Sequence, residues 1–387
     1  MDRNTLKNRV TNTESQSRFI IGMVIGFIVF GVLMIYNVSV IESFAMFGSS
    51  NYFLLQQGQW AIISIVSLLI VSKIPTSFWL AIGPFVFIIA LGLMIAVLVP
   101  GVAVSILGAK RWLSIGGFVL QPSEAMKFAL VLYLATWLAK PRRFLSFLFL
   151  VVPIFGLVML QPDLGSGLIL LSISGGMYVV SGKPFKHILW MLGGGFVGIL
   201  LLILLSPYRM NRLTTFLDPE SDPLGKSYHI RQITIALGNG GLFGQGLGKS
   251  NQKYLYIPEA TTDSVFAIIA EELGFFFCGI IIIGYIVLCT RMSAHIQPVQ
   301  GNTTYYLIGV GVICWFTSQV LVNLSSVVAL IPLTGVPLPF LSYGGSSLLA
   351  LCTAIGILIG LKPTHQTTAT QHAPTRAERK RHRLPFL

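Results

Sequence analysis

A group of carboxylates at the start of an apolar segment is the part of this sequence best suited to chemistry. The stretch 257–263 reads IPEATTD and leads directly into an apolar run that begins at Ser264. Pro258 suits the first turn of a helix, and Glu259 and Asp263 would then share one face at a spacing of four. These carboxylates could simply satisfy a helix end, but ionisable residues beside a membrane span are functional candidates by default. We therefore expect Asp263 and Glu259 to line a site.

Basic residues that could accompany these carboxylates lie in two segments. Lys110 and Arg111 directly precede Trp112. Arg offers a fork of donors that suits phosphate oxygens, so this group could bind a phosphate, although Trp and Arg also serve as interfacial anchors. Further candidate cations lie in the polar stretch 206–263: Arg209, Arg212 and Lys253.

Polar residues at two other span ends are candidates for the same site. The segment QPSEAMK places Gln121, Ser123 and Glu124 ahead of Lys127, and Glu124 and Lys127 share a helix face at a spacing of three. A local ion pair is the alternative interpretation. Asp163, in the turn QPDLG, could cap the following helix or line the same cavity as the polar stretch.

Six glycines between residues 238 and 248 resemble a nucleotide-binding motif only weakly. No strand precedes them and no βαβ unit surrounds them. This pattern is more typical of a loop or short amphipathic helix that lies flat on a membrane surface.

Composition identifies an integral membrane protein. Hydrophobic residues make up 54% of the 387 residues and charged residues only 10%, whereas soluble domains carry about 25% charged residues. Since about 20 apolar residues in a helix cross a bilayer, we predict an all-α integral membrane protein with ten transmembrane helices. The predicted spans are 19–38, 52–71, 79–99, 125–138, 144–160, 164–180, 188–205, 264–290, 305–324 and 341–361.

The spans divide the chain into two tails and one membrane domain. Residues 1–18 form an N-terminal tail, 19–361 the membrane domain, and 362–387 a basic tail that we expect to be disordered. A large loop, 206–263, lies between helices seven and eight. Seventeen of the 26 Lys and Arg residues fall on the side of the termini and eight on the other, so the positive-inside rule predicts cytoplasmic termini and an external loop. Because the charge of +13 lies mostly in these positions, we expect contact with anionic membrane lipid and no nucleic acid.

Several long motifs make the chain resemble the SEDS family (shape, elongation, division, sporulation), the FtsW/RodA-type glycosyltransferases of bacterial wall synthesis. The resemblance covers about residues 18–363. Its QKYLYIPEA form looks closer to the division branch than to the elongation (RodA) branch, which stays an alternative. The motifs are KRWLSIGGFVLQPSE at 110–124, QPDLGSG at 161–167, PYRMNRLTTFLDPESDPLGKSYHIRQ at 207–232, NGGLFGQGLGKSNQKYLYIPEATTDSVFAIIAEELGF at 239–275 and IPLTGVPLPFLSYGGSS at 331–347.

The resemblance implies that the protein polymerises lipid II, a disaccharide-pentapeptide on undecaprenyl diphosphate, outside the bacterial cytoplasmic membrane. It makes Asp263 the catalytic carboxylate and gives Trp112 a functional role. One position departs from the family's pattern: the residue two before the catalytic Asp is commonly His and is Thr261 here. An imidazole at that position therefore has no role in this chain.

The chemistry fits the residues independently. A carboxylate can remove the proton from an acceptor hydroxyl as it attacks the donor sugar, and fixed cations can stabilise a departing diphosphate. A single base with a good leaving group suggests direct displacement with inversion. A divalent cation, Mg or Mn, could replace some side chains, although no ligand set in the sequence identifies one.

Two further classes of function compete with the enzyme. A transporter that flips lipid II would need a polar path across the bilayer, but charges inside the spans are scarce beyond Lys127, Glu271 and Glu272. A scaffold for division proteins would explain the basic tail but not Asp263. The resemblance also implies a partner, a class B penicillin-binding protein that crosslinks the strands, together with other divisome proteins.

Overall fold

The computed structural model describes residues 3–106, 109–115, 118–218, 227–253, 257 and 261–362, and these ranges are mostly helical. The helices are α1 (Arg3–Phe47), α2 (Tyr52–Val71), α3 (Thr76–Ala96), α4 (Pro122–Leu138), α5 (Phe144–Leu160), α6 (Leu164–Val180), α7 (Phe185–Leu204), α8 (Pro207–Leu217), α9 (Tyr228–Gly240), α10 (Val265–Ile296), α11 (Thr303–Val327) and α12 (Gly345–Gly360).

Six helices of the described chain are long and apolar enough to cross a membrane: α1, α2, α3, α7, α10 and α11. Helices α5, α6 and α12 are apolar but have only 16 or 17 residues, and short spans cross a bilayer by thinning it. The chain is therefore a multi-pass membrane protein, while the number of ten spans stays a prediction.

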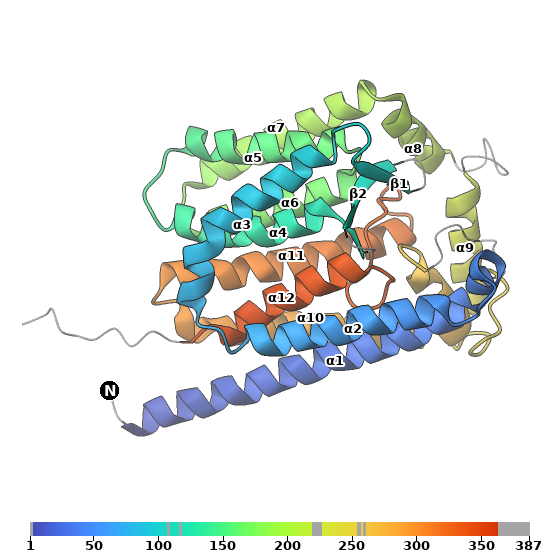
Figure 1. Ribbon diagram of the computed structural model, residues 1–387, viewed down its shortest axis with the longest axis horizontal. Helices are drawn as coiled ribbons and strands as arrows, with labels where there is room; N and C mark the ends of the chain where they lie inside the picture. The colour runs from blue at the N-terminus through green and yellow to red at the C-terminus, as the bar shows by residue number, and fades with distance from the viewer. Residues whose placement is uncertain are drawn as a thin grey trace, which may run out of the picture.

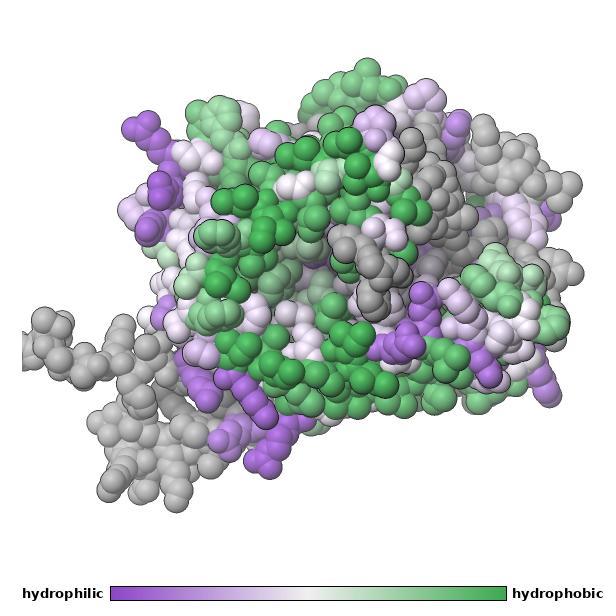
Figure 2. Space-filling model, in the orientation of Figure 1, coloured by the Kyte–Doolittle hydropathy of each residue, from purple (hydrophilic) through white to green (hydrophobic). Residues whose placement is uncertain are grey.

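Most of the helices run roughly parallel along the long axis of the molecule, and α9 runs across it (Figure 1). Helix α12 packs against α2, α4 against α3, and α11 against α6. The N-terminal end of α1 lies at one end of this bundle, and α8, α9 and the strands lie at the other. Hydrophilic residues gather toward the two ends, and apolar residues cover much of the face between them (Figure 2). This distribution matches a bundle that spans a bilayer.

A small antiparallel sheet corrects the expectation of an all-α protein. Strands β1 (Ala103–Ile106), β2 (Ala109–Ile115) and β3 (Phe118–Leu120) pair in the order β1-β2-β3. Consecutive residues Val104 and Ser105 of β1 pair with Trp112 and Lys110 of β2, so Arg111 is an extra residue in a β-bulge. Bulges re-aim side chains and often occur beside active sites.

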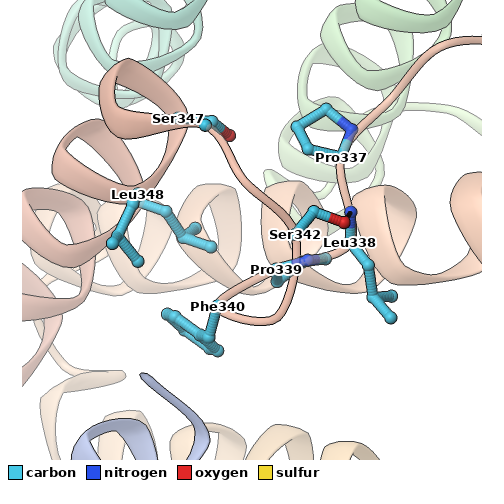
Figure 3. Close-up of a pocket in the computed structure, with 9 residues that line it drawn as sticks. Pro337, Leu338, Pro339, Phe340, Ser342, Ser347 and Leu348 are labelled. Carbon is cyan, nitrogen blue, oxygen red and sulfur yellow. Dashed lines mark hydrogen bonds between the residues drawn. The ribbon is translucent and has the colours of Figure 1, made fainter. Parts of the chain in front are cut away.

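The two ends of the predicted membrane domain also differ from expectation. Helix α1 begins at Arg3, so the predicted polar tail 1–18 is largely helical and continuous with the first span. Residues 331–344 run without regular structure between α11 and α12, which moves the start of the last helix from 341 to Gly345. This loop encloses a cavity of about 10 Å³, the size that one water needs (Figure 3).

Helix α10 contains a break that the sequence interpretation missed. Gly274 has φ 79° and ψ 179°, and it separates Val265–Leu273 from the apolar portion 275–296. The second portion is about 33 Å long at 1.5 Å per residue, which suffices to cross a bilayer. The predicted span 264–290 is therefore two helical segments, and only the second one is a membrane span by this measure.

Glycines of the segment 240–244 pack closely against this break. A Cβ on Gly240 would lie 2.1 Å from the Ala270 carbonyl oxygen, and one on Gly244 would lie 2.2 Å from the Glu272 oxygen. The amides of Gln245 and Phe275 donate across the contact to Glu271 O (2.9 Å) and Gly241 O (3.0 Å) respectively. These glycines allow two backbones to meet, which differs from the membrane-surface role expected for them.

Candidate active site

Asp263 lies among buried polar groups directly before α10. It is only 6% exposed, and its Oδ1 accepts a hydrogen bond from Ser264 Oγ (3.1 Å). Asn323 of α11 donates from Nδ2 to the Asp263 carbonyl oxygen (2.9 Å) and to that of Val336 (2.8 Å). Asp263 lies before the helix rather than in its first turns, because α10 begins only at Val265. The expected spacing to Glu259 falls on a residue outside the described ranges.

The loop 331–344 is bonded to the segment that carries Asp263 and to its neighbours. The Tyr343 amide donates to Thr261 O (2.8 Å), and Arg212 Nη1 donates to Leu333 O (2.5 Å). Together with the Asn323 bond to Val336, these contacts join the loop to α8, to α11 and to the segment before α10. The loop thus fixes the backbone on which Asp263 is carried.

Burial changes the acidity of Asp263. Desolvation by burial raises the pKa of its carboxyl from 3.8 to about 6, and the hydrogen bond from Ser264, a backbone hydrogen bond, and the positive charges of Arg212 and Arg111 oppose this rise. A carboxylate with a pKa nearer to neutrality is a better general base than an ordinary aspartate. Perturbation of this kind in a polar pocket is typical of a functional site.

Arg111 reaches the site from the β-bulge. Its Nη1 lies 3.7 Å from Asp163 Oδ1, and Gln121 Nε2 donates to Asp163 Oδ2 (3.0 Å). Asp163 also accepts from the Ser166 amide (3.0 Å) and so caps α6. The capping interpretation of Asp163 is therefore confirmed, and its place in a shared site stays a prediction. The Arg111 Nε atom is buried and has no partner within the described residues, so it retains a donor for a ligand.

The two arginines of α8 have different roles. Arg212 adds positive charge at Asp263. Arg209, one turn earlier, donates to Met159 O (2.7 Å) and Leu202 O (3.2 Å), the carbonyls near the ends of α5 and α7. Cations suit the C-terminal end of a helix because they complement its dipole. The structure thus brings Arg212 to the site and uses Arg209 to join helices.

Lys253, a predicted phosphate ligand, lies in a second buried cluster. Its Nζ donates to Gly248 O (2.6 Å), Asn37 Oδ1 (3.2 Å) and Glu272 Oε1 (3.3 Å). Asn37 of α1 also donates to Glu272, and Ser250 Oγ donates to Glu271. These bonds tie the segment 248–253 to α1 and α10, so the structure does not group Lys253 with Asp263.

The predicted pair at the start of α4 is an ion pair. Lys127 Nζ lies 2.7 Å from Glu124 Oε1, and both residues are at most 2% exposed. Lys127 also lies 5.4 Å from the ring centre of Trp315. Ser123 Oγ lies 3.3 Å from Ser166 Oγ and joins α4 to α6. The local ion-pair interpretation is confirmed for Glu124 and Lys127.

Some predicted site residues cannot be placed in the pocket, and others were missed. Glu259 and the side chain of Lys110 lie outside the described residues, and Trp112 is half-buried in β2. The sequence interpretation missed Asn323 and Ser264. Asn323 is polar inside an apolar span, a signal that marks functional or structural positions in membrane helices; Ser264 gives no comparable signal.

The described residues do not assemble a metal centre of the usual protein kind. No group of three or more His, Cys, Asp or Glu side chains among them is placed to hold an ion. The positive charge beside Asp263 in this part of the chain comes from Arg111 and Arg212.

Similarity to known proteins agrees with this arrangement. The chain is 36% identical to stage V sporulation protein E of Bacillus subtilis, over 86% of this chain and 92% of the relative. It is 35% identical to the probable peptidoglycan glycosyltransferase FtsW of Trichlorobacter lovleyi, over 88% and 91% respectively.

Solved structures extend the similarity to the fold. A chain of a peptidoglycan synthase complex matches with a TM-score of 0.72 and 26% identity, over 88% of this chain and 95% of that one. The crystal structure of the rod shape determining protein RodA of Thermus thermophilus matches with a TM-score of 0.63 and 26% identity, over 88% and 94%. A family model described as a cell cycle protein matches residues 17–367. The chain therefore belongs to the FtsW/RodA/SpoVE family, which is the SEDS family of the sequence motifs.

Proposed function

We propose that this protein polymerises lipid II on the outer face of the bacterial cytoplasmic membrane, with Asp263 as the general base. The observation that carries the proposal is the buried Asp263, whose pKa lies near 6 and which two arginines face from α8 and β2. A base and fixed cations in one pocket are the two elements that glycosyl transfer from a diphosphate requires.

The class of enzyme follows from the relatives. Curated family members at 33% to 35% identity are named probable peptidoglycan glycosyltransferases, and the solved complex with a similar fold is a peptidoglycan synthase. The chain is accordingly a peptidoglycan glycosyltransferase. Its division role rests on the FtsW-named relatives, and the sporulation relative shows that the branch must be tested separately.

The reaction can be written from the residues of the pocket. The O–H bond of the acceptor's 4-hydroxyl breaks and its proton passes to Asp263 as the oxygen bonds to the anomeric carbon of the donor. The bond between that carbon and the diphosphate breaks, and its electron pair stays on the departing oxygen. Arg212 and the unpartnered Nε of Arg111 would stabilise the charge on undecaprenyl diphosphate. Direct displacement inverts the configuration at the sugar.

Partners and orientation complete the proposal. We expect both termini on the cytoplasmic side and a class B penicillin-binding protein as the crosslinking partner, with other divisome proteins nearby. The solved relative that matches over 95% of its chain belongs to a complex that coordinates polymerization and crosslinking, which supports a partner of this kind.

The test is polymerisation of labelled lipid II by the purified protein with its cognate transpeptidase. We expect glycan strands from the wild type and none from Asp263→Ala or Asp263→Asn. Asp218→Asn is the matched control, because Asp218 is an exposed carboxylate at the end of α8, and it should polymerise normally. If the folded Asp263 variants polymerise at the wild-type rate, the assignment is wrong, and translocation of lipid II across vesicles becomes the next assay.

A further inference from the structure

A histidine of the external loop approaches Asp263 through one intervening hydroxyl. His229 Nε2 of α9 lies 2.9 Å from Ser264 Oγ, and Ser264 Oγ lies 3.1 Å from Asp263 Oδ1. Ser264 is fully buried, Asp263 is 6% exposed and His229 is half-buried. His229, Ser264 and Asp263 therefore form a continuous hydrogen-bonded series from α9 to the Asp263 carboxylate.

Counting protons fixes the direction of these two hydrogen bonds. A serine hydroxyl has one proton, and an ionised carboxylate can only accept. With Asp263 ionised, the Ser264 proton points to Oδ1, so His229 must donate its Nε2–H to the Ser264 oxygen. A neutral imidazole in that tautomer and an imidazolium can both do this.

We propose that His229 is a positioning residue, which acts through the Ser264 hydroxyl to hold Asp263 as an oriented, ionised base. The inference rests on the proposed role of Asp263. With its rotation blocked by the imidazole, the hydroxyl offers its only proton to Oδ1 and leaves Oδ2 for the acceptor hydroxyl. The imidazole absent at Thr261 is thus supplied from α9, 32 positions earlier in the chain.

The surroundings of Asp263 make this one hydroxyl important. The charged groups that act on the carboxylate are Arg212 of α8 and Arg111 of β2, while α11 contributes the neutral Asn323, which bonds the backbone of Asp263 rather than its carboxylate. The Ser264 hydroxyl is the side-chain hydrogen bond that opposes the effect of burial on the carboxyl. Hydrogen bonds to the charged form favour that form, so a hydroxyl free to turn away would leave Asp263 protonated to a higher pH.

The experiment measures the pH dependence of kcat and the KM for lipid II with the full chain and its partner. We expect His229→Ala and Ser264→Ala each to move the acid limb of kcat upward by about one pH unit, a fall of about fivefold at pH 6, with KM unchanged. His229→Gln should restore the limb, because its amide also donates. The double variant should show no larger shift than either single one, as for two groups that act in series.

His187 provides the matched control. It is a half-buried histidine of α7 that bonds Tyr178 Oη (2.7 Å) and stacks on Phe144, so His187→Ala should leave the acid limb in place. The inference is overturned if His229→Ala leaves the acid limb at its wild-type pH, or if His229→Gln shifts the limb as far as His229→Ala does. It is also overturned if the shifts of the two single variants add in the double variant. Polymerisation by Asp263→Asn would instead overturn the proposed function, so the two failures are distinguishable.

Discussion

At Asp263 two opposing effects decide the charge of the carboxyl. Burial favours the neutral form and raises the pKa to about 6, while Arg212, Arg111 and the Ser264 hydroxyl favour the ionised form. The ionised carboxylate, which we propose is the base, is therefore present above about pH 6 and is lost as the pH falls through that value. Removing one of these arginines should raise the pKa of Asp263, so that the carboxylate is protonated at a higher pH.

The arginines of α8 allow this balance to be tested one residue at a time. We predict that Arg212→Gln lowers kcat on the order of 10- to 100-fold at neutral pH, because a cation near the leaving group is lost, and moves the acid limb upward. Arg209→Gln should leave the limb in place and lower the thermal stability in detergent, because Arg209 binds helix-end carbonyls. Equal pH profiles for the two variants would contradict the separation of their roles.

At the scale of elements, the break in α10 positions the segment that follows Asp263. Gly274 has a left-handed φ, and a Cβ there would lie 2.2 Å from the Gly244 amide nitrogen. The segment Val265–Leu273, which follows Asp263, is thereby fastened to the glycine-rich loop through backbone contacts. The position of the base depends on a turn that has no room for a side chain.

A glycine pair within α10 tests this dependence. We predict that Gly274→Ala lowers the free energy of unfolding by more than the roughly 1–3 kcal/mol of backbone strain alone, because the new Cβ also collides with the loop. Gly279→Ala is the control: a Cβ there meets nothing within 4 Å, so its effect should stay within about 1 kcal/mol and favour the helix. Thermal unfolding in detergent measures the stability of both variants. Similar midpoints would refute the close backbone contact between Gly274 and the glycine-rich loop.

The length of the apolar runs predicted many helices well, but it did not predict local backbone geometry. The predicted spans 144–160 and 164–180 agree with α5 and α6, because membrane helices read as continuous apolar runs between polar turns. The strands of 103–120 were missed because short alternating runs carry weak signals beside glycines. The Gly274 break was missed because a glycine inside an apolar run does not reveal its φ.

In the candidate site, too, sequence motifs identified residues, whereas tertiary contacts decided which of them lie together. Motifs pointed to Asp263, Arg111 and Arg212, which the structure brings together. They also pointed to Lys253, which the structure pairs with Glu272 instead. Which residue pairs with a charged side chain depends on how segments far apart in the sequence fold together. Composition and motif spacing do not specify this pairing.

At the scale of the whole molecule, the account requires the pocket and the N-terminus to lie on opposite sides of the membrane. The N-terminal end of α1 and helix α8 lie at opposite ends of the bundle (Figure 1). In a background without the four native cysteines, we predict that a membrane-impermeant maleimide labels Asp218→Cys in intact spheroplasts. Lys73→Cys, an exposed position between α2 and α3, should react only after permeabilisation. The reverse pattern would place the pocket on the cytoplasmic side.

The most direct measurement of the central claim is the rate of lipid II polymerisation by the partner-bound protein between pH 5 and 8. The account predicts an acid limb with an apparent pKa of about 6 in the wild type, as expected from burial of Asp263. In Asp263→Asn it predicts background activity throughout this range. An Asp263→Asn variant that polymerises with the same acid limb as the wild type would contradict the claim that this carboxylate is the base.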